Sequence, residues 1–256
     1  MSHLVRGPVT VRVPATSANL GPGYDSLGLA VSLHDVLTAS VLPSGGLEVE
    51  VEGEGAATVP RDERHLVVRA LRAGFAALGT APPGVRLRCV NAVPHGRGLG
   101  SSSAAIVGGL ALARALVVGG AELLPDDTLF GLAARIEGHP DNVAPAVLGG
   151  LTVAWAEPGS TFEAARLSVA AGLRAVAFVP PDPLETAVAR GLLPSDVPHA
   201  DASFNTGRAA LLVAALTGQV AGDRALLAGT ADRLHQDYRA PAMPDSATLV
   251  QRLRSA

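Results

Sequence analysis

One short segment rich in glycine and serine is the part of this sequence best suited to chemistry. It runs P-H-G-R-G-L-G-S-S-S-A-A from Pro94 to Ala105, with Gly96, Gly98 and Gly100 at alternate positions. Glycine lets the backbone approach an anion closely, and the first turn of a following helix presents unpaired N–H groups. The serine hydroxyls add donors and a ligand for Mg²⁺. The pattern predicts a phosphate cradle, and the alternative is a structural turn capped by serine.

The basic residues narrow this chemistry further. All 20 are arginine, and the chain contains no lysine. A lysine Schiff base, a pyridoxal-phosphate lysine and the lysine of a Walker-A or protein-kinase site are therefore excluded. Any phosphate group must be held by backbone N–H groups, hydroxyls, a metal ion or arginine.

The remaining composition excludes several other classes of protein. A net charge of −3 and an aromatic content of 3% argue against a nucleic-acid-binding surface. The single cysteine, Cys89, excludes an internal disulfide and a cysteine metal cluster. We find no signal-peptide pattern and no apolar run of about 20 residues, so we expect a cytoplasmic protein without a membrane span.

The elements that position the glycine segment are predicted from hydrophobic periodicity. Alternating apolar residues predict strands over residues 9–13, 29–33, 47–51, 85–93, 151–155 and 175–179. Helical spacing predicts helices over 64–78, from 101 to about 118, over 128–137 with Asp127 as N-cap, from near Pro140, from Asp182 onwards, over 205–217 and over 223–237. A boundary near Gly149 and Gly150 divides the chain into residues 1–150 and 151–256.

Five segments, in order along nearly the whole chain, resemble the GHMP small-molecule kinases. Residues 94–105 resemble the second motif of that family. Residues 15–28, A-T-S-A-N-L-G-P-G-Y-D-S-L-G, resemble the first motif of its homoserine kinase branch, and residues 138–150, 186–194 and 232–239 resemble that branch as well. The resemblance implies a two-domain α+β fold. Residues 1–150 would resemble the second domain of ribosomal protein S5, and residues 151–256 would form an incomplete ferredoxin-like part.

The same resemblance implies an activity and a set of site residues. The γ-phosphoryl group of ATP would pass to the side-chain hydroxyl of L-homoserine, a step in threonine biosynthesis. The nucleotide would be bound by Pro94, His95, Gly96, Arg97, Gly98, Leu99, Gly100, Ser101, Ser102, Ser103 and Ala104. Ser102 and Glu137 would hold Mg²⁺, and Asp141 is a candidate general base, although positioning alone can suffice for phosphoryl transfer. The substrate would contact Asn19, Asp25, His139, Asn142, Thr186, Arg190 and Arg239.

The charges in that set suit a zwitterion, because Asp25 matches an ammonium group and the two arginines match a carboxylate. Without the resemblance, these residues would be ordinary turn, capping and surface residues. A third motif of the type G-x-S-G-x-G-P, which GHMP kinases carry near the C-terminus, is not found here, so we expect weak or absent activity. Two alternatives stay open: another GHMP kinase, and an inactive homologue that binds nucleotide or amino acid. The oligomeric state is also open, with a homodimer as one candidate.

Overall fold

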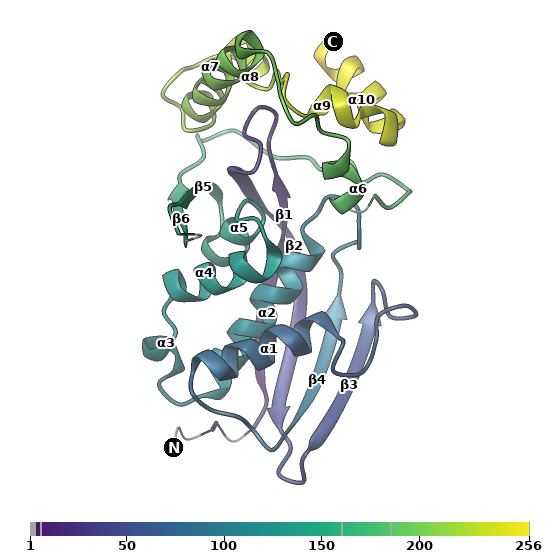
Figure 1. The fold of residues 1–256 in the computed structure, drawn as a ribbon, viewed down its shortest axis with the longest axis vertical. Helices are drawn as coiled ribbons and strands as arrows, with labels where there is room; N and C mark the ends of the chain where they lie inside the picture. The colour runs from purple at the N-terminus through teal and green to yellow at the C-terminus, as the bar shows by residue number, and fades with distance from the viewer. Residues whose placement is uncertain (1–3, 6, 160, 185, 256) are drawn as a thin grey trace.

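A computed structural model describes residues 4–5, 7–159, 161–184 and 186–255. Figure 1 shows a twisted sheet with helices packed against it, and a separate group of helices at the end of the molecule opposite the N-terminus. The sheet contains β1 (Val9–Ala18), β2 (Leu27–Val41), β3 (Gly46–Gly53), β4 (Gly84–Asn91), β5 (Leu151–Glu157) and β6 (Thr161–Leu167). The fold is therefore mixed α and β, as the sequence predicts.

Strand β2 connects the sheet. It pairs with β1 along most of its length, while Val36–Val41 pairs with β4 and Leu27–Leu29 pairs with β5 on the other side. The order of the sheet is β3-β4-β2-β5-β6, and only β3 and β4 run parallel. At Gly28 a Cβ atom would lie 2.0 Å from the carbonyl oxygen of Asp141. Only glycine lets that segment approach β2 so closely.

Ten α-helices complete the described parts of the chain. Five belong to the sheet region: α1 (Leu66–Ala77), α2 (Ser101–Leu116), α3 (Gly120–Leu123), α4 (Asp126–Glu137) and α5 (Val143–Leu148). The others are α6 (Thr186–Gly191), α7 (His199–Leu216), α8 (Asp223–Gly229), α9 (Gln236–Arg239) and α10 (Pro244–Ser255), with a 3₁₀ turn at Ala240–Ala242. None of the helices in the described ranges is long and apolar enough to cross a membrane.

The hydrophobic core lies between the sheet and its helices. Helix α2 is central to it, since Leu110, Leu112 and Leu116 are fully buried against α1, α4 and the sheet. Among the described residues that follow β6, the buried apolar side chains are Ala189, Leu212 and Ala215. The C-terminal helices therefore lie outside the core.

Most predicted elements are confirmed, and the exceptions have physical explanations. Residues 175–179 do not form the predicted strand: Val176 is 75% exposed and Phe178 is 62% exposed. Their alternation suits a strand, but no described strand lies beside them to share hydrogen bonds. Conversely, the sequence did not predict β6, which is an edge strand with a largely exposed, polar pattern.

Helix boundaries account for the remaining differences. Pro125, not Asp127, is the N-cap of α4, and Asp127 lies in its first turn. Asp182 does not cap α6, because Pro183 and Leu184 are not helical and the helix is described from Thr186. The helix predicted over 223–237 is two helices, α8 and α9, separated by an irregular segment. The division at residue 150 stays a prediction; β5 and β6, which follow it, pair into the same sheet as β1–β4.

Candidate active site

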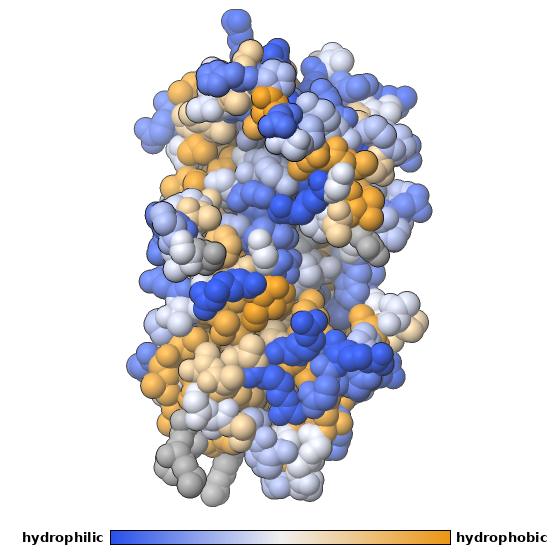
Figure 2. Space-filling view, in the orientation of Figure 1, coloured by the Kyte–Doolittle hydropathy of each residue, from blue (hydrophilic) through white to orange (hydrophobic). Residues whose placement is uncertain are grey.

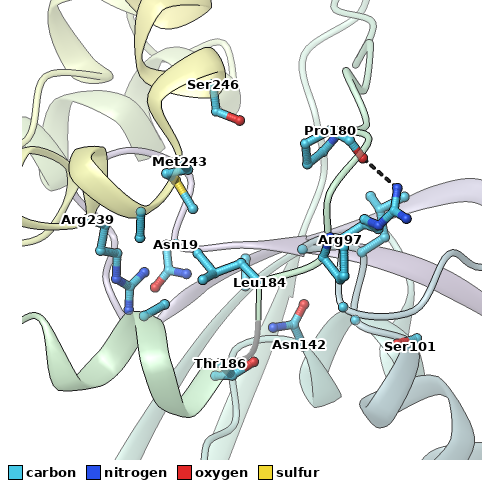
Figure 3. Close-up of a pocket in the computed structure, with 18 of the residues that line it drawn as sticks. Asn19, Arg97, Ser101, Asn142, Pro180, Leu184, Thr186, Arg239, Met243 and Ser246 are labelled. Carbon is cyan, nitrogen blue, oxygen red and sulfur yellow. Dashed lines mark hydrogen bonds between the residues drawn. The ribbon is translucent and has the colours of Figure 1, made fainter.

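A cavity of about 630 Å³ lies between the sheet region and the C-terminal helices. Figure 2 shows hydrophilic side chains gathered across the face between these two parts. In Figure 3, Arg97 and Ser101 lie on one side, Arg239 on the other, and Asn19 and Asn142 between them. The predicted site residues that line the cavity are Asn19, Asp25, Gly96, Arg97, Gly98, Leu99, Gly100, Ser101, Ser102, Glu137, His139, Asp141, Asn142, Thr186, Arg190 and Arg239.

Four predicted nucleotide residues do not line it. Pro94 and His95 precede the part of the loop that faces the cavity, and Ser103 and Ala104 are fully buried in the first turn of α2. Of the predicted nucleotide segment, residues 96–102 are therefore the part that faces the cavity.

The glycine loop needs its glycines for their backbone conformation. Gly96, Gly98 and Gly100 have φ angles of 67°, 72° and 64°, in the left-handed region. A Cβ atom on Gly100 would lie 2.0 Å from Oγ1 of Thr16 and 3.0 Å from Oδ1 of Asn142. Because of this conformation, the N-terminus of α2 faces the cavity. It presents unpaired N–H groups and the positive end of the helix dipole there.

Glu137 faces this helix N-terminus. Oγ of Ser102 donates to its Oε1 at 2.5 Å, and Oγ of Ser103 donates to the same oxygen at 2.9 Å. The side chain is only 8% exposed, although it ends α4 just before Gly138, whose φ of 91° turns the chain. Glu137 is therefore not a solvent-exposed helix-end residue: its carboxylate lies beside Ser102, which the resemblance pairs with it, and beside Ser103.

Ser102 and Glu137 fit a hard divalent cation. Both present oxygen, the donor that Mg²⁺ prefers, and Mg²⁺ is usually held by one or two protein oxygens together with substrate phosphates. Within the described ranges no group of three His, Cys, Asp or Glu side chains could form a cage made of protein alone. This donor set suits a metal ion shared with a phosphate ligand.

His139 and Asp141 form a second buried group. Nδ1 of His139 lies 2.6 Å from Oδ1 of Asp141, which also accepts the backbone N–H of Asn142 at 2.9 Å. The hydrogen bond to Asp141 raises the pKa of His139 and outweighs its burial. Oγ1 of Thr16 donates to Oδ1 of Asn142 at 2.8 Å. Asp141, which is 2% exposed, thus fixes His139 and Asn142.

The loop between β1 and β2 supplies the opposite wall in a strained conformation. Asn19, Leu20 and Asp25 have φ angles of 69°, 42° and 56°, which non-glycine residues adopt at a cost. Oδ1 of Asn19 accepts the backbone N–H of Asp25 at 3.1 Å and so stabilises the turn. Strain of this kind is typical of segments that position functional groups.

Asp25 and Arg190 form a bidentate ion pair. Nη1 and Nη2 of Arg190 donate to the two carboxylate oxygens at 3.0 and 2.5 Å. Burial lowers the pKa of Arg190, but the hydrogen bond and charge of Asp25 outweigh it, so the net shift is upward. Arg190 belongs to α6 and Arg239 to α9, so the cavity brings together charges from distant parts of the chain.

The segment before α6 is bonded to the glycine loop, and the sequence did not predict this contact. Nη1 of Arg97 donates to the carbonyl oxygen of Pro180 at 2.7 Å (Figure 3). The backbone N–H of Leu184 donates to the carbonyl oxygen of Gly96 at 2.8 Å. Pro180 and Leu184 line the cavity. The Arg97–Pro180 contact joins residues 83 positions apart, and a contact over such a separation leaves no local signal in the sequence.

Buried polar contacts attach the C-terminal helices to the β1–β2 loop. Nδ2 of Asn205 donates to the carbonyl oxygen of Pro22 at 3.2 Å, and Nε2 of His235 lies 2.6 Å from the carbonyl oxygen of Gly21. Asp232 accepts Nδ2 of Asn205 and the N–H groups of His235 and Gln236. Burial opposes its ionisation, but those hydrogen bonds prevail and lower its pKa.

Comparison with known proteins identifies the family. Residues 65–150 match the GHMP kinases N terminal domain. The chain is 56% identical over 246 residues to a homoserine kinase of Streptomyces coelicolor, covering 96% of this chain and 78% of that protein. It is 52% identical to a homoserine kinase of Clavibacter michiganensis, covering 96% and 76%. The chain belongs to the homoserine kinase family.

Solved structures agree with this membership. A putative homoserine kinase from Listeria monocytogenes is 32% identical, with a TM-score of 0.63 over 88% of this chain and 72% of that one. A homoserine kinase from Cytophaga hutchinsonii superposes with a TM-score of 0.77 over 95% of this chain and 78% of that one; at 23% identity it shows the fold alone. The chain therefore has the GHMP kinase fold that the motifs imply.

Within this homoserine kinase family member, sequence analysis missed part of the site. Phe178, Pro180, Leu184 and Met243 line the cavity, and Tyr24 lies beside Arg190 and Arg239. Tyr24 stands inside the first motif, between the glycine and aspartate of G-Y-D. An aromatic residue inside a glycine-rich polar loop was the available signal.

Proposed function

We propose that this chain binds ATP and Mg²⁺ at the glycine loop and phosphorylates the side-chain hydroxyl of L-homoserine. One observation carries the proposal: a single cavity holds the Ser102–Glu137 pair at the N-terminus of α2 and, across from it, the charged residues Asp25, Arg190 and Arg239. Membership of the homoserine kinase family supports the same reaction.

The glycine-loop side would bind the phosphates. Backbone N–H groups of residues 98–102 and the positive end of α2 attract anions, which suits a chain without lysine. Ser102 and Glu137 would hold Mg²⁺, which, when bound, neutralises charge on the nucleotide phosphates. Arg97 adds a guanidinium on the same side of the cavity.

The opposite side would bind a zwitterion. The carboxylate of Asp25 suits the ammonium group of homoserine, and the guanidinium groups of Arg190 and Arg239 suit its carboxylate. Mevalonate carries a carboxylate but no ammonium group, so Asp25 would gain no partner from it. The charges therefore favour an amino acid over other alcohols that GHMP kinases phosphorylate.

The reaction would proceed by in-line displacement. The homoserine hydroxyl oxygen forms a bond to the γ-phosphorus, the bond from that phosphorus to the bridging oxygen of ADP breaks, and the hydroxyl proton passes to water. Because such transition states are loose, positioning and charge neutralisation supply most of the catalysis. Oδ1 of Asp141 already accepts bonds from His139 and Asn142, which favours a positioning role over proton abstraction.

A substrate panel tests the proposal. Steady-state assays of residues 1–256 with ATP and Mg²⁺ should give a kcat/KM for L-homoserine at least about 100-fold above that for mevalonate, because mevalonate offers the partly exposed carboxylate of Asp25 no ammonium partner. A preference for mevalonate would contradict the proposal. Absence of turnover with every alcohol would support an inactive homologue, and thermal shift with nucleotide and then homoserine would show whether ligands still bind. The expected weak activity, cytoplasmic location and homodimer stay predictions.

A further inference from the structure

The ring of Tyr24 lies under both arginines of the substrate side. Cζ of Arg190 is 5.6 Å from the ring centroid, and Cζ of Arg239 is 5.0 Å from it. Both distances fall within the range of cation–π contact. One aromatic side chain is thus shared by two guanidinium groups that come from different helices, α6 and α9.

Arg239 depends on this ring more than Arg190 does. Arg190 is fixed by Asp25, whereas no carboxylate in the described ranges forms an ion pair with Arg239. Nε of Arg239 is buried without a hydrogen-bond partner, and α9 contributes no buried residue. The described residues therefore give the guanidinium of Arg239 no ion pair, and its cation–π contact with Tyr24 is the specific interaction that they do give it.

The Tyr24 ring also has an aromatic neighbour. The imidazole of His235 lies against it, with a centroid distance of 5.3 Å and an interplanar angle of 35°. Nε2 of His235 donates to the carbonyl oxygen of Gly21, because a carbonyl can only accept, and Gly21 belongs to the same loop as Tyr24. The loop, His235 and the ring therefore form one unit, on which the arginines rest.

We propose that Tyr24 is a positioning residue that holds the guanidinium groups of Arg190 and Arg239 for the substrate carboxylate. The proposal rests on the proposed function. A guanidinium stacked on an aromatic face keeps its N–H edge free for bidentate bonds to a carboxylate. The guanidinium groups contact the ring of Tyr24, whereas its hydroxyl forms no hydrogen bond with the described residues. The ring would thus set affinity for one end of the substrate and leave the nucleotide side unaffected.

Two substitutions and two substrates test this role. Tyr24→Leu removes the ring, Tyr24→Phe retains it, and Tyr238→Leu removes the other, exposed tyrosine of the chain as a control. The substrates are L-homoserine and 3-aminopropan-1-ol, which is homoserine without its carboxylate. KM and kcat would be measured for each, together with KM for ATP, and thermal unfolding would confirm that each variant folds.

We expect Tyr24→Leu to raise KM for homoserine about tenfold, the size of two lost cation–π contacts. KM for ATP and kcat should stay within about threefold. Tyr24→Phe should restore the parent KM, and Tyr24→Leu should leave kcat/KM for 3-aminopropan-1-ol unchanged.

Three results would overturn the proposal. An equal loss with both substrates would mean that the ring only shapes the loop. A Tyr24→Phe variant as impaired as Tyr24→Leu would mean that the hydroxyl matters. A parent chain that binds no homoserine would remove both this role and the proposed function. If the parent binds homoserine without turnover, the proposed function alone fails, and calorimetric affinities for the two ligands decide the role of Tyr24 by the same ratios.

Discussion

The glycine-loop side of the cavity is built on the hydrophobic core, whereas the substrate side is held by polar contacts between distant segments. Ser103 and Ala104, at the start of α2, are fully buried. Helix α9, which carries Arg239, has no buried residue. The chain thus combines a well-packed glycine-loop side, where we propose that phosphates bind, with a proposed substrate side whose geometry depends on a few ion pairs, hydrogen bonds and ring contacts.

This difference separates two kinds of loss. Changes at the glycine loop should reduce turnover in a protein that still folds and still binds its alcohol. Changes on the substrate side should reduce affinity for the amino acid and loosen the C-terminal helices, with little effect on the nucleotide. Variants on each side test whether the two sides of the cavity act independently.

The largest effect is expected at Glu137. Glu137→Gln keeps an oxygen that accepts from Ser102 and Ser103 but removes the charge that would hold Mg²⁺. We expect kcat to fall by about 10²–10³-fold, as when one electrostatic stabiliser of a transition state is lost, with stability near that of the parent. Steady-state kinetics and chemical denaturation measure both. Glu63→Gln, at an exposed ion pair with Arg72, is the control. A kcat within threefold of the parent would contradict a role for Glu137 in catalysis.

A smaller effect is expected at Asp232. Asp232→Ala leaves the N–H groups of His235 and Gln236 and the amide of Asn205 without their acceptor. We expect a loss of about 2 kcal/mol of stability, because buried donors would lack partners. KM for homoserine should rise several-fold and KM for ATP should not.

Urea unfolding and the two KM values measure the Asp232→Ala effect. Asp223→Ala, at the exposed start of α8, serves as the control. If KM for ATP rose as much as KM for homoserine, the two sides of the cavity would not be independent.

The smallest effect is expected in the pH dependence of stability, which should differ between variants at two buried carboxylates. Burial raises the pKa of Asp35, despite its bonds from the N–H groups of Val93 and Ala92, whereas the pKa of Asp232 is lowered. A raised pKa gives a stability contribution that is present at low pH and is lost as pH rises. A lowered pKa gives one that is present at neutral pH and is lost on acidification.

Asp35→Asn should therefore gain stability relative to the parent as pH rises from about 3 to about 7, since asparagine keeps the acceptor without the buried charge. Asp232→Asn should lose stability relative to the parent over the same range. Denaturation curves at several pH values distinguish the two, and parallel trends would show that both carboxylates are stabilised alike.

Sequence alone predicted what short segments determine. The glycine loop, the start of α2 and the position of Glu137 at the end of α4 follow from local spacing, and the structure places them as expected. The same local rules failed for residues 175–179, where alternation occurs without a neighbouring strand. They also failed for β6, where an edge strand lacks a strong apolar pattern.

Contacts between distant segments were not predictable in this way. Asp25 and Arg190 stand 165 positions apart, and sequence could name both as substrate residues without showing that they pair with each other. The sharing of Tyr24 by two guanidinium groups depends on how α6 and α9 are placed against the β1–β2 loop. No periodicity or motif predicts that placement, because it depends on contacts between distant segments: Arg190 with Asp25 for α6, and His235 with Gly21 next to α9.

The pairing of Asp25 with Arg190 makes each the counterion of the other. In the proposed site, a ligand carboxylate that reaches Arg190 would have to displace Asp25 and leave the aspartate unneutralised, whereas Arg239 has no such counterion among the described residues. A ligand that carries only an amine, and that pairs with Asp25, would leave Arg190 without a counterion. A zwitterion exchanges one internal salt bridge for two external ones, so the charge balance is kept throughout. We therefore expect inorganic anions, organic acids and simple amines to compete poorly with a zwitterion at the proposed substrate side.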